Sequence, residues 1–254
     1  MLKINLDQRG LLKAVIDNPP VNALSRILVD ELYGLCDRVD PELTRMVVIT
    51  SEGKHFSAGA DLKEKVGMSD GEVVKSVQYL SDTFQRIWEI PVPTIAAING
   101  SCLGGGMELA LACDIRILAD GASMGLKETS VGVIPGAGGT VRLPRLIGES
   151  RAKKWIFTAE TFTAEEALAD GVVDWLVNPD QLDNAVEEIF EKIASNAPLS
   201  VKASKKSINS GLSKSLKEAL KAEQTAYRSI IGTRDRREGL DAFREKRPAV
   251  WKGK

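Results

Sequence analysis

Three consecutive glycines, Gly104–Gly106, stand directly before an apolar stretch that carries one acidic residue, Glu108. Glycine lowers helix stability by about 1 kcal/mol relative to alanine, so a run of three at a helix start indicates that something approaches the backbone closely. A glycine-rich turn leading into a helix presents unpaired N–H groups at the positive end of the helix dipole. Such groups can hold an oxyanion, and we expect the amide of Gly105 to be one donor because no side chain shields it.

A second backbone donor would be needed for an oxyanion site, and the run Ser57–Ala60 offers one. Its residues are all small, and they stand immediately before a segment compatible with a helix. The same run is also typical of a tight strand-to-helix turn without any ligand, and the residues alone leave both interpretations open.

Two carboxylates are candidates for acid–base chemistry. Glu128 follows Glu108 by twenty residues, which is about 30 Å along a continuous helix. Residues 114–119 are predicted to form a strand between them, so the two side chains can meet only if the chain doubles back. Taken singly, Glu128 is typical of a surface residue. Glu108 has apolar neighbours, although it could also be an acid stabilised by the helix dipole at ~0.3–1 kcal/mol.

Other chemistries are excluded or disfavoured by the sequence. His55 is the single histidine, so a cluster of histidine ligands for a metal is impossible, and we expect His55 to be incidental. No G-x-S-x-G elbow of a serine hydrolase is present. The loop at 132–139 fails both the dinucleotide and the P-loop patterns. We therefore expect acid–base chemistry by carboxylates, with no metal and no cofactor.

The bulk composition is that of a globular chain. Its 254 residues are 43% hydrophobic and 27% charged, with a net charge of −1, which suits one large domain or a domain with an appendage. The charged N-terminus predicts no secretory signal, and no run approaches the ~18 apolar residues of a membrane span. Cys36, Cys102 and Cys113 lack CxxC spacing and are predicted to be reduced, buried thiols in a cytoplasmic protein.

Buried strands and helices alternate over most of the chain. Apolar or β-branched runs predict strands at 11–17, 45–51, 93–100, 114–119 and 122–126. Helical spacing predicts helices at 25–37, 70–90, directly after the three glycines, and at 163–170, 180–196, 198–209, 215–231 and 235–246. Thr163 and Glu166 form a capping box at the start of one of these helices. The pattern predicts an α/β core over residues 1–195 and a helical region over 196–254.

Five motifs, in this order, resemble the crotonase (enoyl-CoA hydratase/isomerase) superfamily. They are NPPVNALS at 18–25, HFSAGADLKE at 55–64, INGSCLGGGMELALACD at 98–114, GLKETSVGVIPGAGGTVRLPRLIG at 125–148 and EGLDAFREKRPAVWKG at 238–253. The match covers essentially the whole chain. The resemblance implies a spiral of ββα turns, a C-terminal helical region that builds homotrimers, commonly paired into homohexamers, and acyl-CoA thioesters as substrates.

The resemblance also implies roles for individual residues. The amides of Ala60 and Gly105 would form the oxyanion hole for the thioester enolate. Glu108 and Glu128 would hold the reacting water, with Glu128, placed in a strand by the family pattern, as the principal proton-transfer residue. Contacts with CoA and substrate are implied for Val21, Ala23, Ala58, Asp61, Leu62, Lys63, Leu103, Pro135 and Gly136, and for Phe243 and Lys246 reaching from a neighbouring subunit.

The presence of both glutamates favours the hydratase branch, which adds water to a 2-enoyl-CoA, in fatty-acid or branched-acyl breakdown. Two close carboxylates in an apolar pocket raise the pKa of one of them, so that one can hold a proton while the other stays ionised. The residues before Glu128 lack the Gln-Pro of many straight-chain hydratases and look more like the methylglutaconyl-CoA hydratase branch. That activity and Δ3,Δ2-enoyl-CoA isomerisation are the alternatives.

The C-terminal region is basic. Residues 198–254 carry fifteen Lys or Arg against six Asp or Glu, which is explained by solvated helix faces or by contact with a polyanion such as CoA. An RNA-binding module is a more distant alternative, because the sequence has no aromatic stacking motif for RNA.

Overall fold

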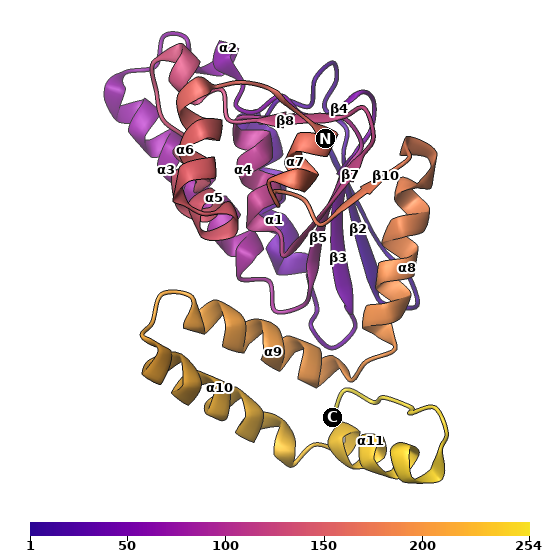
Figure 1. Ribbon diagram of the computed structural model, residues 1–254. Helices are drawn as coiled ribbons and strands as arrows, with labels where there is room; N and C mark the ends of the chain where they lie inside the picture. The colour runs from indigo at the N-terminus through magenta and orange to yellow at the C-terminus, as the bar shows by residue number, and fades with distance from the viewer.

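Two β-sheets form the core of the protein, whose computed structural model describes residues 1–254 (Figure 1). The larger sheet has the strand order β1-β2-β3-β5-β7-β10, and the smaller has the order β4-β6-β8-β9. The strands of the larger sheet are β1 (Leu2–Leu6), β2 (Leu11–Ile16), β3 (Met46–Ser51), β5 (Thr94–Ile98), β7 (Ile115–Ala119) and β10 (Trp175–Val177). Those of the smaller sheet are β4 (His55–Ser57), β6 (Ser101–Leu103), β8 (Ser123–Gly125) and β9 (Phe162–Thr163).

Successive stretches of chain add one strand to each sheet before a helix follows. Strands β3 and β4 precede α2 (Leu62–Lys65) and α3 (Asp70–Trp88), and strands β5 and β6 precede α4 (Gly105–Ala112). Strands from adjacent turns pair in parallel in both sheets, β3 with β5 and β5 with β7 in the larger, β4 with β6 and β6 with β8 in the smaller. The predicted spiral of ββα turns is therefore confirmed.

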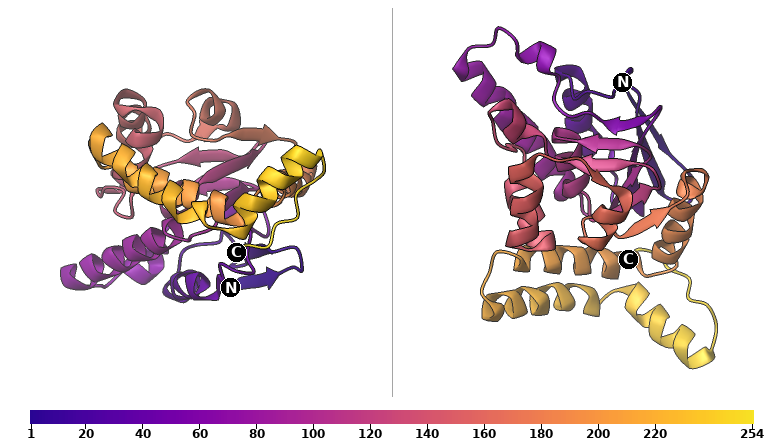
Figure 2. Two further views of the ribbon diagram at one scale, coloured as in Figure 1. Left: turned by 90° about the horizontal axis from the view of Figure 1, so that it is seen from below. Right: turned by 45° about the horizontal axis from the view of Figure 1, so that its top comes forward.

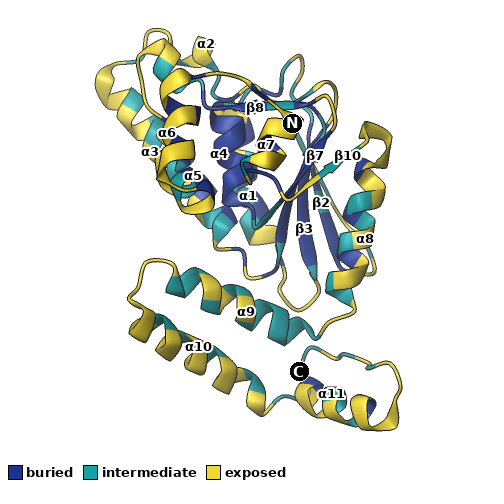
Figure 3. Cartoon of the chain, in the orientation of Figure 1, coloured by how far each residue is buried: buried dark blue, intermediate teal, exposed yellow.

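Helix α4 is the most deeply buried helix of the chain. All eight of its residues are buried, and Figure 3 shows it as dark blue as the central strands β3 and β7. Helix α1 (Arg26–Leu35) begins at Ser25, whose side chain accepts a hydrogen bond from the Leu28 amide. Because α4 is enclosed on every side, any polar group on it must be matched by the chain around it.

The remaining helices of the core pack against the sheets, against α4 or against one another. They are η1 (Cys36–Arg38), η2 (Glu128–Val131), α5 (Gly139–Ile147), α6 (Glu149–Thr158), α7 (Ala164–Ala169), η3 (Pro179–Gln181) and α8 (Leu182–Ala194). Helix α8 buries Leu182, Val186 and Phe190 in a second apolar cluster against the larger sheet. The predicted capping box at Thr163 and Glu166 is confirmed at the start of α7.

Three helices follow the core and lie beneath it in Figure 1 and in the right-hand view of Figure 2: α9 (Pro198–Gly211), α10 (Leu216–Ile231) and α11 (Arg234–Glu245). The predicted boundary at residue 195 falls between α8 and α9. No residue of α9 or α10 is buried, and apolar side chains such as Ile208, Leu212 and Tyr227 are exposed. No helix of the chain is both long and apolar enough to cross a membrane.

Two expectations need correction. Glu128 does not lie in a strand, because β8 ends at Gly125 and Glu128 is the first residue of the 3-10 helix η2. Of the three cysteines, Cys102 and Cys113 are buried free thiols as predicted, but Cys36 is only half-buried. It stands at the end of α1, where the helix surface meets solvent.

Candidate active site

The turn at Gly104–Gly106 is held tightly against strands β4 and β8 of the smaller sheet. Gly104 has φ 52 and ψ −127, and its amide donates to the carbonyl of Gly125 at 2.8 Å. A Cβ atom on Gly106 would lie 2.6 Å from the carbonyl oxygen of Ser57, closer than real Cβ atoms come. The three glycines therefore let α4 start directly against the segment Ser57–Ala60.

The Ala60 and Gly105 amides lie side by side at this contact. A Cβ atom on Gly105 would lie 3.6 Å from the Ala60 nitrogen, and one on Gly59, which has φ +90, would lie 3.0 Å from the Gly105 nitrogen. Leu24 fixes the loop, because its amide donates to the Gly59 carbonyl at 2.8 Å. Neither the Ala60 nor the Gly105 amide donates to a protein acceptor. The pair can therefore bind one oxygen of a ligand.

Glu108 is buried, with 2% of its surface exposed. Its Oε1 accepts hydrogen bonds from the amides of Ala137 and Gly139, each at 2.8 Å. Burial raises the pKa of Glu108, and the two amides and the positive charge of Arg142 oppose that rise. The glycine-rich loop before α5 thus orients a carboxylate. The sequence predicted substrate contacts for Pro135 and Gly136 of this loop but did not predict that the loop orients Glu108.

Glu128 lies beside the first of the three glycines. Its Oε1 would be 3.3 Å from a Cβ atom on Gly104, and Gly104 is one helical turn from Glu108, whose amide donates to the Gly104 carbonyl. The chain therefore doubles back and brings the two glutamates together. Burial, reinforced by the charge of Glu108, raises the pKa of Glu128 to about 7. Its Oε2 is buried and has no hydrogen-bond partner in the chain.

Most of the residues expected to contact CoA surround the Ala60 loop. The amide of Ala58 donates to the carbonyl of Val21 at 3.0 Å, and the Asp61 side chain caps α2 by accepting from the Lys63 amide. Ala23 precedes Leu24 on the adjoining segment, Leu103 ends β6 next to Gly59, and Leu62 is exposed.

The other expected contacts lie apart from that loop. Gly136 packs against α3, since a Cβ atom on it would lie 2.6 Å from Cγ1 of Val77, and its neighbour Pro135 is buried. Phe243 and Lys246 belong to the end of α11, on the far side of the core from α2 (Figures 1 and 2). Phe243 is 86% exposed. Their contact with CoA from a neighbouring subunit stays a prediction.

Lys65, at the C-terminal end of α2, is a site residue that sequence reasoning missed. Its positive charge opposes the rise in the pKa of both Glu108 and Glu128. It also lines a cavity of about 280 Å³ that includes Ala60. A surface-facing lysine in a charged segment gives no sequence signal of this position, because the position depends on where α2 sits.

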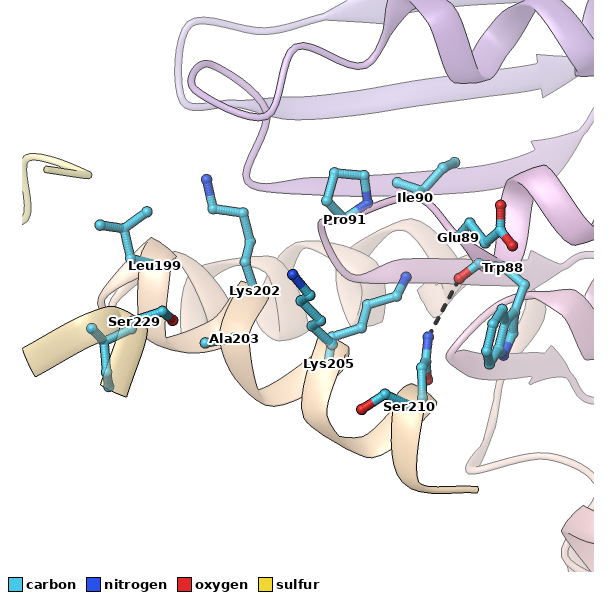
Figure 4. A pocket seen from close by; sticks show the side chains of 13 residues that line it. Trp88, Glu89, Ile90, Pro91, Leu199, Lys202, Ala203, Lys205, Ser210 and Ser229 are labelled. Carbon is cyan, nitrogen blue, oxygen red and sulfur yellow. Dashed lines mark hydrogen bonds between the residues drawn. The ribbon is translucent and has the colours of Figure 1, made fainter. Parts of the chain in front are cut away.

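A larger cavity, of about 640 Å³, lies elsewhere, between the end of α3 and the helices α9 and α10. Trp88, Lys202 and Lys205 are among its lining residues (Figure 4). None of the residues expected to act in catalysis lines it.

Comparison with known proteins places this geometry in a family. A sequence model described as enoyl-CoA hydratase/isomerase matches residues 7–254. The crystal structure of enoyl-CoA hydratase from Bacillus anthracis superposes with a TM-score of 0.96 at 44% identity, covering 100% of this chain and 99% of that one. The fold is therefore the crotonase fold.

Curated relatives agree with the family model. The Bacillus subtilis (strain 168) protein YngF, whose name includes enoyl-CoA hydratase/isomerase, is 47% identical over 234 residues, 91% of this chain and 90% of that protein. The mitochondrial methylglutaconyl-CoA hydratase of Mus musculus is 42% identical over 238 residues, 91% of this chain and 76% of that protein. The chain belongs to the enoyl-CoA hydratase/isomerase family.

Proposed function

We propose that the protein adds water to a 2-enoyl-CoA and forms the 3-hydroxyacyl-CoA. The observation that carries this proposal is the buried, unpartnered Oε2 of Glu128, which lies beside the glycine turn together with Glu108. A buried carboxyl oxygen without a partner is costly. A water bound between two carboxyl groups would satisfy it, and water is the co-substrate of a hydratase.

The Ala60 and Gly105 amides polarise the thioester carbonyl in this scheme. Both are free of protein acceptors and adjacent, so the carbonyl oxygen accepts from both. As C2 gains electron density, the charge on that oxygen grows and the two bonds strengthen. One such donor typically contributes ~2.7–4 kcal/mol of transition-state stabilisation.

The two glutamates divide the proton transfers. The Oε1 atom of Glu108 is engaged by two amides, which leaves Oε2 to orient water. The ionised carboxylate takes a proton from water as the water oxygen bonds to C3, and the protonated carboxyl of Glu128 gives its proton to C2. One molecule of water is added across the double bond, and the pair still holds one proton. Because the carboxyls interact, they titrate as a unit.

Two related activities have specific support. The matched family model is described as hydratase/isomerase, and a Δ3,Δ2-isomerase needs one carboxyl to move a proton along the acyl chain. The mouse relative is named a methylglutaconyl-CoA hydratase, which would be the same addition of water on a branched acyl group that carries a carboxylate. Retention of both glutamates favours hydration over isomerisation.

Oligomerisation belongs to the same proposal. Helices α9 and α10 bury no residue within one chain, and Leu220 and Tyr227 are exposed on α10. Exposed apolar surface of this kind is typical of an interface. A homotrimer, single or paired into a hexamer, would cover it and bring the exposed Phe243 and Lys246 of α11 to a neighbouring acyl-CoA site.

A substrate panel tests the proposed activity. The purified protein is incubated with crotonyl-CoA, 3-methylglutaconyl-CoA and a 3-enoyl-CoA. The products are separated by chromatography beside standards of the 2-enoyl and 3-enoyl isomers and are identified by mass spectrometry. We expect a mass gain of one water from at least one 2-enoyl-CoA. Conversion of the 3-enoyl-CoA to its 2-enoyl isomer without hydration of any substrate would make the isomerase the correct activity. No turnover of any of the three would contradict both.

A further inference from the structure

The side chain of Arg142 reaches back over the start of its own helix, α5. Its Nη1 donates a hydrogen bond to the carbonyl of Ala137 at 3.0 Å, and its Nη2 donates to Oε1 of Gln85 on α3 at 3.1 Å. Both acceptors are neutral, so neither bond neutralises the charge of this half-buried side chain. The guanidinium group therefore links the loop before α5 to a neighbouring helix.

Gly138 leaves room for the guanidinium group. It has φ +117, and a Cβ atom on it would overlap Nη1 of Arg142. A side chain at this position would push the guanidinium group away from the Ala137 carbonyl. The loop thus has a glycine at the point where the arginine must pass.

Ala137 connects Arg142 to Glu108. Its carbonyl accepts from Arg142, and its amide donates to Oε1 of Glu108 at 2.8 Å. With 1% of its surface exposed, Ala137 is shielded from bulk water, and hydrogen bonds and charges interact more strongly in such surroundings. Because both polar groups of this one residue are engaged, a movement of the guanidinium group changes the direction of the amide that holds the carboxylate.

The start of α5 holds a cation and an anion together. The positive end of the helix dipole favours the Glu108 carboxylate and disfavours the guanidinium group. Burial raises the pKa of Glu108, and the charges of Arg142 and of Lys65, at the end of α2, oppose that rise, while Glu128 at the start of η2 is the other acid of the site. Among these charged groups, Arg142 is the one connected to Glu108 by hydrogen bonds.

We propose that Arg142 is a positioning residue for Glu108: by holding the Ala137 carbonyl, it fixes the loop whose amides orient this carboxylate. The inference rests on the proposed function, because it concerns the glutamate that takes a proton from water. The positive charge of Arg142 also favours the ionised carboxylate, which is the form that accepts a proton. Arg142 itself does not touch the substrate in this scheme.

A kinetic comparison of Arg142→Met and Arg142→Lys tests the role. Methionine is of similar length but neither donates nor carries a charge, and a small misplacement of a catalytic group can cost about 100-fold in rate. We expect kcat to fall about 10–100-fold in Arg142→Met, with KM nearly unchanged because the Ala60 loop is untouched. Lysine keeps the charge and can donate to the Ala137 carbonyl, so Arg142→Lys should recover most of the kcat.

The pH profile of kcat/KM separates this role from a merely structural one. Loss of the positive charge should raise the lower apparent pKa of the profile, because the ionised carboxylate is then less favoured. This value belongs to the pair of glutamates, since they titrate as a unit. Arg142→Lys should keep the wild-type value. A loss of rate in Arg142→Met that is equal at every pH would overturn the role.

The matched control is Arg145→Met. Arg145 lies on the same helix, is exposed, and donates through Nη1 to the carbonyl of Val141 at 2.7 Å, so that its bond stays within α5. This variant should keep the wild-type kcat and pH profile. An equal loss of kcat in both methionine variants, or an unchanged kcat in Arg142→Met with the fold intact by circular dichroism, would overturn the inference.

Gln85→Met is a milder test of the same link. Gln85 is exposed, and its replacement removes only the acceptor of Nη2, so the variant should fold. We expect a smaller loss of kcat than in Arg142→Met and none when it is added to Arg142→Met, because the link is already broken there. Losses that multiply in the double variant would contradict the link.

A stability measurement needs no turnover and separates this inference from the proposed function. Tm is measured at pH 8 for the wild type, Arg142→Met, Glu108→Gln and the double variant. We expect Arg142→Met to lower Tm less in the Glu108→Gln background, because the charge that Arg142 compensates is absent there. Such coupling without hydration of any enoyl-CoA would uphold the positioning of Glu108 and overturn only the reaction. Additive changes in Tm, with hydration of crotonyl-CoA by the wild type, would overturn the positioning alone.

Discussion

The Oε1 atom of Glu108 accepts a hydrogen bond from the Gly139 amide at 2.8 Å, and a Cβ atom on Gly139 would lie 3.1 Å from that same oxygen. The same Cβ atom would lie 2.7 Å from Cβ of Pro135. Gly139 is therefore the residue that lets the loop before α5 close over the Glu108 carboxylate. The backbone amide of Gly139 therefore sets the direction of the Glu108 carboxylate.

Gly139→Ala should displace Glu108 and slow hydration. A shift of about 1 Å at a catalytic group can cost about 100-fold in rate, so we expect kcat to fall by roughly that factor. Binding of acyl-CoA should change less, because the Ala60 loop is untouched. Steady-state kinetics and calorimetry on the same variant separate the two effects.

Gly34→Ala is the matched control for that substitution. Gly34 lies within α1 and a Cβ atom there would meet nothing within 4 Å. Alanine at this position should keep full activity and raise the free energy of unfolding by about 0.5–1 kcal/mol. Equal activity in both alanine variants would mean that the Gly139 contact does not position Glu108.

Gly105→Pro should remove one of the two amide donors while α4 is kept, because proline is tolerated in the first turn of a helix. Loss of one oxyanion donor typically costs about 100–1,000-fold in kcat. The proline ring must also be accommodated next to Leu24, whose Cδ1 would lie 3.0 Å from a Cβ atom at this position, so the fold is checked by circular dichroism. A folded variant with wild-type turnover would exclude Gly105 as a donor.

The raised pKa of Glu128 predicts that the stability of the protein depends on pH through this carboxyl group. The folded protein raises its pKa from the ordinary 4.5 to about 7, so the folded state binds more protons than the unfolded state between these two pH values. The contribution of this carboxyl group to the free energy of unfolding therefore falls as the pH rises from 4.5 to 7. Above pH 7 it falls no further.

Glu128→Gln should then raise Tm relative to the wild type at pH 8 and have a smaller effect at pH 5. Differential scanning fluorimetry across this range measures the difference. The control is Glu188→Gln, at an exposed position of α8, which should show no such trend. A Tm difference for Glu128→Gln that does not grow with pH would contradict the buried state of this carboxyl.

Much of the site follows from local sequence features, and the rest depends on how distant segments meet. Small residues in Ser57–Ala60 and Gly104–Gly106 indicate exposed backbone, and the structure brings these two runs into contact. The contact between Glu108 and the loop before α5 spans 31 residues and has no periodic signal. Likewise, nothing local places Lys65 in the wall of the cavity that includes Ala60.

There are physical reasons why some helices and strands could not be predicted from the sequence. Strands β4 and β6 contain three residues each, too few for a visible alternation of apolar and polar residues. Helix α5 begins at a glycine and contains Pro144, which are both signals against a helix interior.

The central claim is that Glu128 transfers the proton during hydration, and Glu128→Gln tests it most directly. Turnover of the best 2-enoyl-CoA substrate and binding of its saturated analogue are measured on the same preparation. We predict that kcat falls at least about 100-fold, the lower range for general acid–base catalysis, while the analogue binds with nearly unchanged Kd. Near-normal turnover with intact binding would contradict the account.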